Sequence, residues 1–536
     1  MLTLPLEPTD DRANPLFKDT ASCEQWLGQL QLTNLQKAHS LLFDQINELN
    51  RYPMRGIERL NTLELLRETV GYVQDDYAKK LISKPLPLNE SELMVFVAIV
   101  QLWTAMNLGY QRCLQAYIAD DKQLAKHGAL LCQRSLLYSG LEIFEHLRSG
   151  YEFDPKLWNQ LHELYAFAEE RNFQSGEVAD PLNQKYPRSS CRSVYVKTLL
   201  ACHARPAELT RSQLQLLNNW LTQWSGAVTV EHSYTTSRGD AQPLATDLES
   251  QRGLQLIGHI RPSDTMRYLA MVPLSKLLRV KTILLQQGQT PRQVNLCEHC
   301  SSNDCIEFLT FLHQCWCEES GSRCGERRPI AERAQVCYKP EGIYAHLSGK
   351  PFKQPARDHA LGSMAMKPAE SLSRALQDAH NKELLEMGYP LETWQFENES
   401  ISGARLTRED TFGGRLNYNQ LIALRPSDAE TFMLGVTAWA NVTRAGQLQI
   451  GVRYLPGSAK AVSMRAVNMG VPEKYVPAFL LPAIAALNTP ASLIIPRDWF
   501  QSGRMLEILY QDGEKENVEL GFSVERGVDY ERVSFT

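Results

Sequence analysis

Apolar residues recur every three or four positions over the first three hundred residues, the spacing that buries one face of an α-helix. One such stripe begins at Leu35, within the capping-box pattern Thr33-Asn34-Leu35-Gln36, and the same pattern joins Thr210 to Gln213. Further stripes occupy residues 60–77, 93–147 with a break at 119–121, 157–168, 194–201 and 214–224. We therefore expect an all-α N-terminal region, built as a helical bundle or as an array of helical hairpins.

A polar segment interrupts this pattern over residues 172–192, and its glycine and two prolines indicate a boundary. Beyond it, residues 227–230 and 254–260 are apolar runs short enough to be strands. The pattern therefore predicts a helical domain over residues 1–172 and a small helical and mixed domain over residues 190–320.

From residue 395 onward, apolar and polar residues alternate over short runs separated by Gly, Pro, Asn and Asp, as in strands joined by turns. Seven such runs span residues 421–424, 431–439, 447–455, 461–464, 492–495, 506–510 and 518–524. Short strands in this number favour antiparallel barrels. We predict a β-barrel over residues 325–468 with a helical insertion at 345–390, and a second β-rich unit over residues 470–536. The expected fold class is α+β with several domains.

Composition narrows the classes of function. The 536 residues are 43% hydrophobic and 22% charged, as in globular proteins, and the net charge of −5 gives no reason to expect general nucleic-acid or lipid-surface binding. The longest apolar runs fall short of the roughly 20 residues that a membrane span needs. The first residues lack the basic and apolar segments of a signal peptide, so we expect a cytoplasmic protein without a membrane span.

The segment Asn398-x-Ser400-x-x-Gly403 carries the clearest chemistry in the sequence. The Asn398 amide offers a donor and an acceptor, Ser400 adds a hydroxyl, and Gly403 lets the backbone pass close to a ligand because it has no Cβ. These groups together suit the edge of a nucleotide base. The same residue types also serve any tight turn, and that structural interpretation stays open here.

Residues 398–455 resemble the PilZ domain, a six-stranded barrel that bacteria use as a receptor for cyclic di-GMP. The motif at Asn398 fits the family's Asp/Asn-x-Ser-x-x-Gly pattern, Leu434-Gly435-Val436 leading to Trp439 is similar to its crossing strand, and residues 446–455 are similar to its closing strand. The resemblance implies cyclic di-GMP as ligand, with Asn398 and Ser400 at the guanine edge and Gly403 shaping the turn.

PilZ proteins supply positive charge from an Arg-x-x-x-Arg pair that precedes their first strand. The matching candidates here are Arg327, Arg328 and Arg333, ahead of an expected strand at residues 334–338. Arginine suits this role because its planar fork binds phosphate or guanine with two hydrogen bonds. The spacing departs from the family, since four residues separate Arg328 from Arg333, and residues 339–397 separate the expected strand from Asn398.

A group of cysteines forms a second candidate site. A zinc ion could be held by Cys297, Cys300, Cys315 and either Cys317 or Cys324, with His299 or His313 as spare ligands. The second pair falls within an expected helix over residues 304–316, where cysteines also serve as small core residues. Buried reduced thiols are the interpretation that we favour, so we expect neither a metal nor another cofactor.

Signatures of several enzyme classes are absent from the sequence, among them G-x-S-x-G, H-E-x-x-H and G-x-G-x-x-G. We therefore expect no catalysis, and the PilZ resemblance implies a bacterial signalling protein. In it, a PilZ-like receptor for cyclic di-GMP would relay ligand binding to a helical region that binds an unidentified protein partner. Two alternatives remain: a ligand-independent scaffold or chaperone-like adaptor with a degenerate barrel, and a zinc-containing structural protein.

Overall fold

The computed structural model divides the chain into two compact units, Met1–Lys84 with Leu88–Gly321, and Pro85–Pro87 with Ser322–Thr536. The structure describes all residues except 1, 3, 5, 184, 236–239, 260, 299, 319–327, 330–331, 356–381, 409–412 and 468–473. The units meet in the sequence near residue 325, where the barrel was expected to begin. The expected boundary at residues 172–192 does not separate compact units, because the helices on both of its sides belong to the first one.

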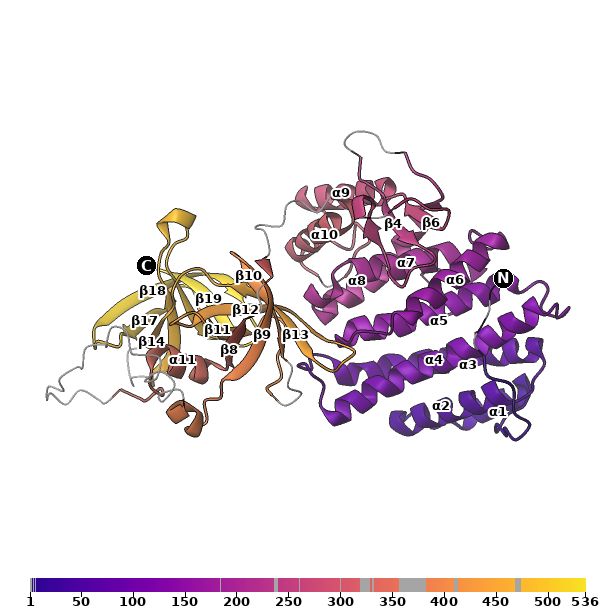
Figure 1. Cartoon of the computed structure of the whole chain (residues 1–536), viewed down its shortest axis with the longest axis horizontal. Coiled ribbons are helices and arrows are strands. Elements are labelled where there is room, and N and C mark those ends of the chain that lie inside the picture. Colours follow the sequence, from indigo (N-terminus) through magenta and orange to yellow (C-terminus); the bar gives the residue numbers. More distant parts are fainter. Residues whose placement is uncertain are drawn as a thin grey trace. The chain divides into compact units, whose positions relative to one another are not determined.

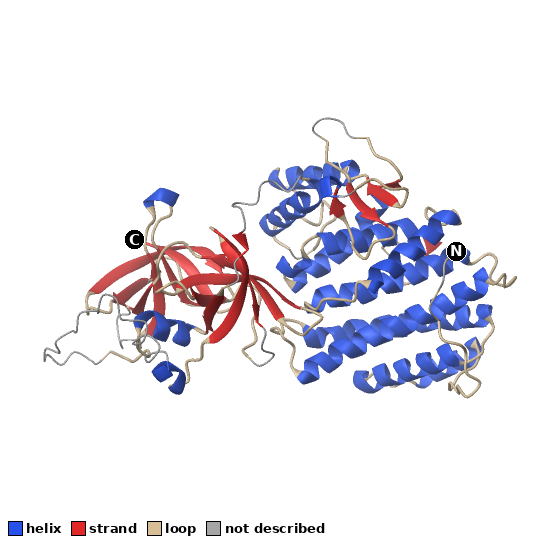
Figure 2. Cartoon of the chain, in the orientation of Figure 1, coloured by secondary structure: helices blue, strands red, loops and turns tan. Residues whose placement is uncertain are grey.

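The first unit is a stack of helices with a small sheet (Figures 1 and 2). Its helices are α1 (Thr20–Gln29), α2 (Leu35–Arg51), α3 (Gly56–Ala78), α4 (Glu90–Ile118), α5 (Gly128–Ser149), α6 (Lys156–Glu170), α7 (Cys191–His203), α8 (Arg211–Trp224), α9 (Val272–Gln286) and α10 (Ser302–Cys317). The predicted cap at Thr210 is confirmed, since its hydroxyl accepts from the Gln213 amide at 3.2 Å. At α2 the cap is Asn34, one residue later than the sequence pattern suggested.

Helix α4 has the length and apolar composition of a membrane-crossing helix, and half of its most apolar window is buried inside the first unit. It packs against α2, α3 and α5. Buried hydrogen bonds hold it there: its Asn107 amide donates to Ser139 Oγ of α5 at 2.9 Å, and Asn50 of α2 donates to its Ala105 carbonyl at 2.8 Å. Packing within the helical stack therefore accounts for its apolar character.

Buried ion pairs tie the helices to the short hairpin of β1 (Val178–Ala179) and β2 (Arg188–Ser189). Arg134 on α5 bonds Glu64 on α3 at 2.9 Å, and Arg67 bonds Asp180, which follows β1, at 2.9 Å. Both arginine side chains are almost fully buried, so the carboxylates offset the cost of placing their charge in the interior.

A four-stranded antiparallel sheet in the order β3-β6-β4-β5 completes the first unit. Its strands are β3 (Val230–Glu231), β4 (Leu244–Asp247), β5 (Gln255–Leu256) and β6 (Met266–Leu269). The mixed character predicted for this region is confirmed. The predicted strands at 227–230 and 254–260 are only partly correct, since each contributes two paired residues or fewer, and β4 and β6 carry the longest pairing.

The second unit begins with a six-stranded barrel, as the PilZ resemblance implies. Its strands close in the order β10-β13-β12-β11-β8-β9, and the short β7 adds to β9 outside the ring. The bounds are β7 (Arg328–Pro329), β8 (Arg333–Tyr338), β9 (Glu392–Ser400), β10 (Gly403–Arg408), β11 (Leu421–Pro426), β12 (Met433–Val442) and β13 (Leu448–Tyr454). We call this the first barrel. The expected helical insertion at 345–390 lies largely outside the described residues.

The second barrel closes in the order β14-β15-β16-β19-β18-β17. Its strands are β14 (Lys460–Ala466), β15 (Val476–Leu481), β16 (Ser492–Pro496), β17 (Met505–Leu509), β18 (Lys515–Arg526) and β19 (Tyr530–Phe535). The run at residues 461–464 was assigned to the first barrel by its predicted limit at 468, and this is wrong, because β14 pairs with β15 and β17.

A shared apolar core joins the two barrels through α11 (Pro340–Ser348). It contains Ile343 and Tyr344 of α11, Leu434 of the first barrel, and Phe479 and Leu481 of the second. The interior of the second barrel forms a separate core. Strands of the second barrel are thus buried on both faces, which explains why parts of their sequence read as continuous apolar runs rather than as alternation.

Candidate functional site

The Asn398–Gly403 segment lies in the hairpin between β9 and β10, as its turn composition predicts. Ser400 pairs with Gly403, and the Ser400 hydroxyl donates to the Gly403 carbonyl at 3.1 Å. A Cβ on Gly403 would lie 2.0 Å from the Val452 carbonyl oxygen on β13. Gly403 therefore permits close approach of a neighbouring strand. Ser400 and Gly403 therefore both stabilise the structure of the turn. Asn398 lies on β9, two positions before the turn.

A β-bulge gathers polar side chains on one face of this hairpin. Leu406 pairs with Phe396 in the barrel core, whereas Arg405 pairs with Asn398, so Glu397 is the extra residue. Cross-strand partners share a face, which places Asn398 on the side of Arg405. Arg405 Nε lies 2.7 Å from Glu397 Oε2, and its Nη2 donates to Gln449 Oε1 at 2.8 Å.

Trp439 completes this face from the crossing strand β12. A second register shift between Thr437 and Trp439 brings Trp439 opposite Gly451. The indole lies across that glycine, because a Cβ on Gly451 would come 1.9 Å from Trp439 Nε1. The Arg405 guanidinium lies 5.7 Å from the centre of the Trp439 ring, within the range of a cation–π contact.

The arginine-bearing segment lies beside the motif despite the long sequence between them. Strand β7 pairs with β9 so that Arg328 faces Glu399 and Pro329 faces Asn398. Arg333 starts β8 and pairs with Gln395, further along β9, where it is exposed. Arg327 lies outside the described residues. A long insertion separates the arginines from Asn398 in the sequence, but the pairing of β7 with β9 brings Arg328 and Asn398 to one edge of the barrel.

Four residues of the site were not among the sequence-based candidates: Glu397, Arg405, Trp439 and Gln449. Arg405 stands two positions after Gly403, so alternation along a strand from the turn could have placed it on an exposed face. The bulges could not have been located, because they depend on the pairing of three strands. Trp439 was noted only as a landmark of the crossing strand.

The chemistry of this face suits a purine, and a guanine best. A guanidinium can donate two hydrogen bonds to guanine O6 and N7, and a carboxylate accepts from the amide-like N–H groups of its other edge. The exposed part of the Trp439 indole offers a surface on which a flat base can stack. Arg405 and Glu397 also neutralise each other, so phosphate charge must be met chiefly by other arginines.

A buried network fixes the opposite end of the same strands. Arg408 of β10 bonds Glu392 of β9 at 2.9 Å and donates to the Gly414 carbonyl at 2.7 Å, and its guanidinium lies 5.3 Å from the centre of the Trp394 ring. The Tyr338 hydroxyl also donates to Glu392. Burial, followed by that carboxylate, raises the pKa of Tyr338. These contacts set the register of β8, β9 and β10 and so position the site residues.

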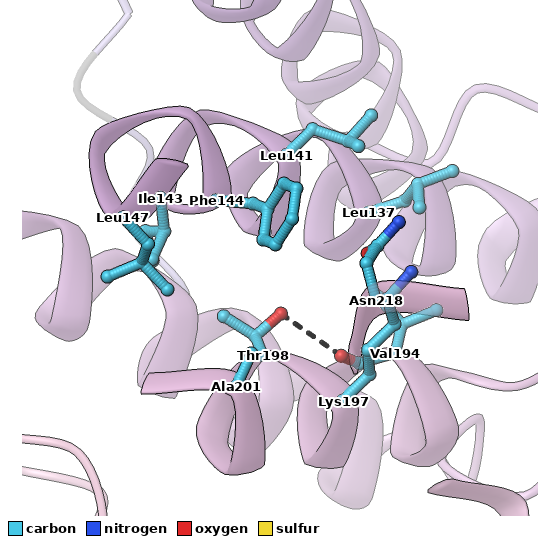
Figure 3. A pocket seen from close by; sticks show the side chains of 11 residues that line it. Leu137, Leu141, Ile143, Phe144, Leu147, Val194, Lys197, Thr198, Ala201 and Asn218 are labelled. Atoms are coloured by element: carbon cyan, nitrogen blue, oxygen red, sulfur yellow. Dashed lines mark hydrogen bonds between the residues drawn. The ribbon is translucent and has the colours of Figure 1, made fainter. Parts of the chain in front are cut away.

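The first unit has cavities of its own, and two of them lie beside α7. An apolar one of about 20 Å³ between α5 and α7, lined by Phe144, Thr198 and Lys197, has room for about one water molecule, too little for a nucleotide (Figure 3). A polar groove of about 760 Å³ beside it is lined by Asp180, Arg188 and Lys197, among others. Lys197 donates to Thr222 Oγ1 at 2.8 Å, and burial lowers the pKa of its ammonium to about 8.

The predicted set of four cysteines is not brought together. Cys297 and Cys300 are adjacent, but Cys315 Sγ accepts from Arg205 Nε at 3.2 Å, away from them. Cys317 is buried near the end of α10, and burial raises the pKa of its thiol to about 12. His313 contacts Ser275 and Arg279. The helix pattern predicted Cys305 and Cys315 as core residues, and of these Cys305 is buried whereas Cys315 is only partly buried.

Comparison with known proteins agrees with this architecture. Residues 21–235 match the N-terminal domain of the cyclic-di-GMP receptor FimW, and residues 462–536 match the FimW C-terminal beta-barrel domain. The chain is also 22% identical, over 558 aligned positions, to the cyclic-di-GMP receptor FimW of Pseudomonas aeruginosa, covering 95% of this chain and 90% of that protein. The two matched segments run from α1 to β3 in the first unit and from β14 to β19 in the second barrel, together more than half of the sequence. Over these segments the chain is similar to the FimW proteins.

Proposed function

We propose that this protein is a receptor for cyclic di-GMP that acts by binding rather than by catalysis, in the cytoplasm. The observation that carries the proposal is the pairing of β7 with β9, which puts the backbone of Arg328 beside Asn398 and Glu399. A relative that spans nearly the whole chain is named as a receptor for the same dinucleotide, and this supports the choice of ligand.

In this proposal, the dinucleotide lies across the edge formed by β7, β9 and β10. The phosphates and one guanine are bound by Arg327, Arg328 and Arg333. These residues carry the positive charge that the hairpin of β9 and β10 does not have to spare. Asn398 and Ser400 contact a guanine edge, and Gly403 keeps the hairpin tight against β13. Arg405, Glu397 and Trp439 add a stacking and hydrogen-bonding surface for a base.

The helical unit is proposed to bind a protein partner whose engagement depends on the ligand. The two units divide in the sequence between residues 321 and 322, shortly before Arg328, so a ligand that holds β7 against β9 acts close to that division. A dinucleotide with higher affinity for the closed pairing shifts the population toward it by that difference in affinity. Ligand binding would in this way change how accessible the helical unit is to its protein partner.

The test is calorimetric titration of cyclic di-GMP into the full chain and into Arg328→Ala and Asn398→Ala. A hydrogen bond to a charged group contributes about 1.5–3 kcal/mol, so Arg328→Ala should weaken binding by roughly 10- to 100-fold. Asn398→Ala, which removes neutral hydrogen bonds, should weaken it by roughly 3- to 10-fold. Arg444→Ala is the matched control, because this exposed arginine lies in the turn at the other end of β12 and β13.

Three outcomes separate the possibilities. Weaker binding in both site variants and unchanged binding in Arg444→Ala supports the site. Unchanged affinity in both site variants would exclude the barrel edge and direct the search to the polar groove beside Lys197, with Arg188→Ala as the next variant. Absence of heat with the wild-type chain at tens of micromolar dinucleotide would refute the receptor function and leave the ligand-independent scaffold.

A further inference from the structure

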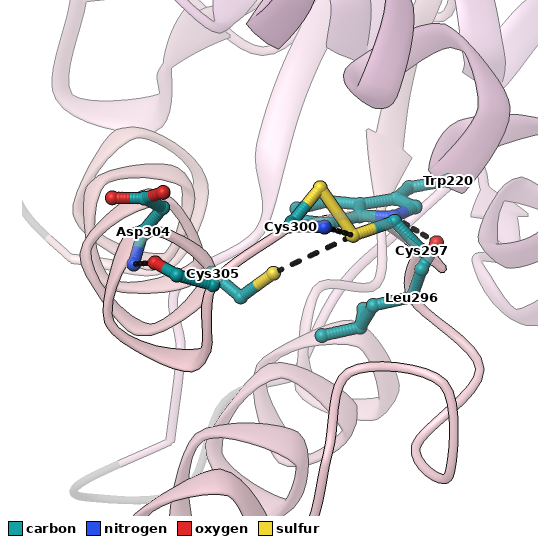
Figure 4. Close-up of a disulfide and its surroundings, with 7 residues drawn as sticks. Trp220, Leu296, Cys297, Cys300, Asp304 and Cys305 are labelled. Carbon is teal, nitrogen blue, oxygen red and sulfur yellow. Dashed lines mark hydrogen bonds between the residues drawn. A yellow bond between two sulfur atoms is a disulfide. The ribbon is translucent and has the colours of Figure 1, made fainter.

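Three cysteine sulfur atoms converge where the loop after α9 meets the start of α10. The ligand atoms of Cys297, Cys300 and Cys305 all lie within 4.8 Å of one another, a grouping of thiols found among the described residues of the first unit (Figure 4). Cys297 and Cys300 are bonded as a disulfide, and Cys305 Sγ lies 4.0 Å from Cys297 Sγ. This group lies outside the proposed ligand site and plays no part in it.

The surroundings hold each sulfur in place. The Cys300 amide donates to Cys297 Sγ at 3.2 Å, a bond that stabilises negative charge on that sulfur. Cys305 is only 2% exposed and lies in the first turns of α10, whose N-terminus is capped by Ser301. The carbonyl of Leu296, next to Cys297, accepts from the Trp220 indole at 3.0 Å, which fixes the loop against α8.

A disulfide alone does not account for this arrangement. The bond between Cys297 and Cys300 spans a sequence separation of 3, and closing so short a loop constrains the unfolded chain little. It also leaves the third thiol unexplained. Around a tetrahedral zinc ion with Zn–S bonds of about 2.3 Å, neighbouring sulfurs lie about 3.8 Å apart. The 4.0 Å between Cys297 and Cys305 is close to that value.

We propose that Cys297, Cys300 and Cys305 form a zinc site in the reduced protein. Thiolate ligands select soft or borderline cations, and among divalent ions this favours zinc over magnesium or calcium. Three thiolates fill three tetrahedral positions, and the fourth is open to water or a further ligand. The set differs from the sequence-based candidates, because Cys305 takes the place of Cys315 and Cys317.

The disulfide and the zinc site are two states of the same sulfurs. A small thiol reductant of the glutathione class supplies two electrons and two protons, which convert the Cys297–Cys300 bond into two thiols while two reductant molecules join in a disulfide. Zinc then binds three thiols and displaces three protons. A reducing cytoplasm favours the zinc-binding state. The ion would fasten the loop that contacts Trp220 to the first turns of α10.

The test is zinc content of the full-length chain, purified and reconstituted with zinc under a phosphine reductant and then desalted. We expect one tightly held ion per chain in the wild type and loss of most of it in Cys305→Ser. Cys315→Ser is the matched control on the same helix and should keep its zinc. Cobalt substitution provides a second measurement, since the thiolate-to-cobalt absorption per bound cobalt ion should be lower by about a third in Cys305→Ser.

Two results would overturn the proposal. One is a reduced wild-type chain that retains far less than one zinc ion after reconstitution. The other is equal zinc retention in wild type and Cys305→Ser, which would place the ion elsewhere. Circular dichroism of Cys305→Ser establishes that a loss of zinc does not arise from unfolding, and cobalt absorption in folded Cys297→Ser gives an independent count of thiolates. Cyclic di-GMP is absent from these measurements, so their outcome is independent of the receptor function.

Discussion

At the scale of single residues, Glu142 on α5 is a carboxyl group buried among helices. It is 7% exposed, and burial raises its pKa from 4.5 to about 7, although a hydrogen bond from Thr104 acts in the opposite direction. Between these two values the folded state keeps a proton that the unfolded state has lost. Because the folded state binds more protons there, stability falls as pH rises through this window.

We therefore predict that Glu142→Gln reduces the loss of thermal stability between pH 5 and pH 8. The full shift corresponds to ~3 kcal/mol as an upper limit, which the wild type loses and the neutral amide does not. Circular dichroism melts of both proteins at the two pH values measure this difference. Glu163→Gln on the exposed face of α6 is the control and should follow the wild type. Parallel pH dependence of Glu142→Gln and wild type would contradict the pKa argument.

At the scale of elements, two β-bulges shape the candidate site. The bulge at Glu397 and the register shift before Trp439 bring β9, β10, β12 and β13 into one arrangement, in which Trp439 covers Gly451. Any side chain at Gly451 must displace the indole from its place beside Arg405. The glycine thus controls the shape of the face through packing.

We predict that Gly451→Ala weakens cyclic di-GMP binding by roughly 5- to 100-fold, the range for loss of one stacked base. Overpacking should also cost about 1–3 kcal/mol of barrel stability. The double variant Gly451→Ala with Trp439→Ala removes the clash, so it should recover part of that stability while binding stays weak. Calorimetry and thermal melts separate the two effects. Full affinity in Gly451→Ala would show that the indole does not contact the ligand.

The elements also show what the sequence could predict. Helical periodicity located α2 to α8 and α10 but neither α1 nor α9, and short apolar runs between turn residues located strands such as β11, β13 and β17. Strand β9 was not predicted, because the extra residue Glu397 breaks its alternation. Strand β15 was not predicted, because Pro477 is unusual within a strand. The pairing of Arg328 with Glu399 and the approach of Cys305 to Cys297 depend on tertiary folding across long or turning segments, which residue spacing does not encode.

At the scale of the whole molecule, the second unit places two barrels around one apolar core. Strand β16 shows the arrangement, since Ile494 faces the core shared with α11 and the first barrel, whereas Leu493 faces the interior of the second barrel. Polar contacts add to the junction: Asn419 donates to the Arg526 carbonyl at 2.9 Å, and the Leu421 amide donates to Asp529 at 3.0 Å. The first barrel therefore depends on the second for part of its stability.

Two matched substitutions test this dependence. Leu481→Ala removes side-chain volume from the shared core, and Leu493→Ala removes the same volume from the interior of the second barrel. Each should cost about 2–5 kcal/mol, because both side chains are fully buried. We predict that Leu481→Ala raises amide hydrogen exchange in β12 of the first barrel and weakens dinucleotide binding. Leu493→Ala should raise exchange mainly within the second barrel.

The difference in hydrogen exchange between Leu481→Ala and Leu493→Ala depends on local opening of each barrel rather than on global unfolding. Amides exchange through the least costly opening that exposes them, so a cavity beside β12 increases its exchange even while both barrels stay folded. Hydrogen-exchange mass spectrometry under native conditions resolves the two barrels by peptide. Equal exchange in β12 for Leu481→Ala and Leu493→Ala would mean that the barrels open as one unit whichever core is damaged. Unchanged amide exchange of β12 in Leu481→Ala would instead show that the shared core does not influence the ligand site.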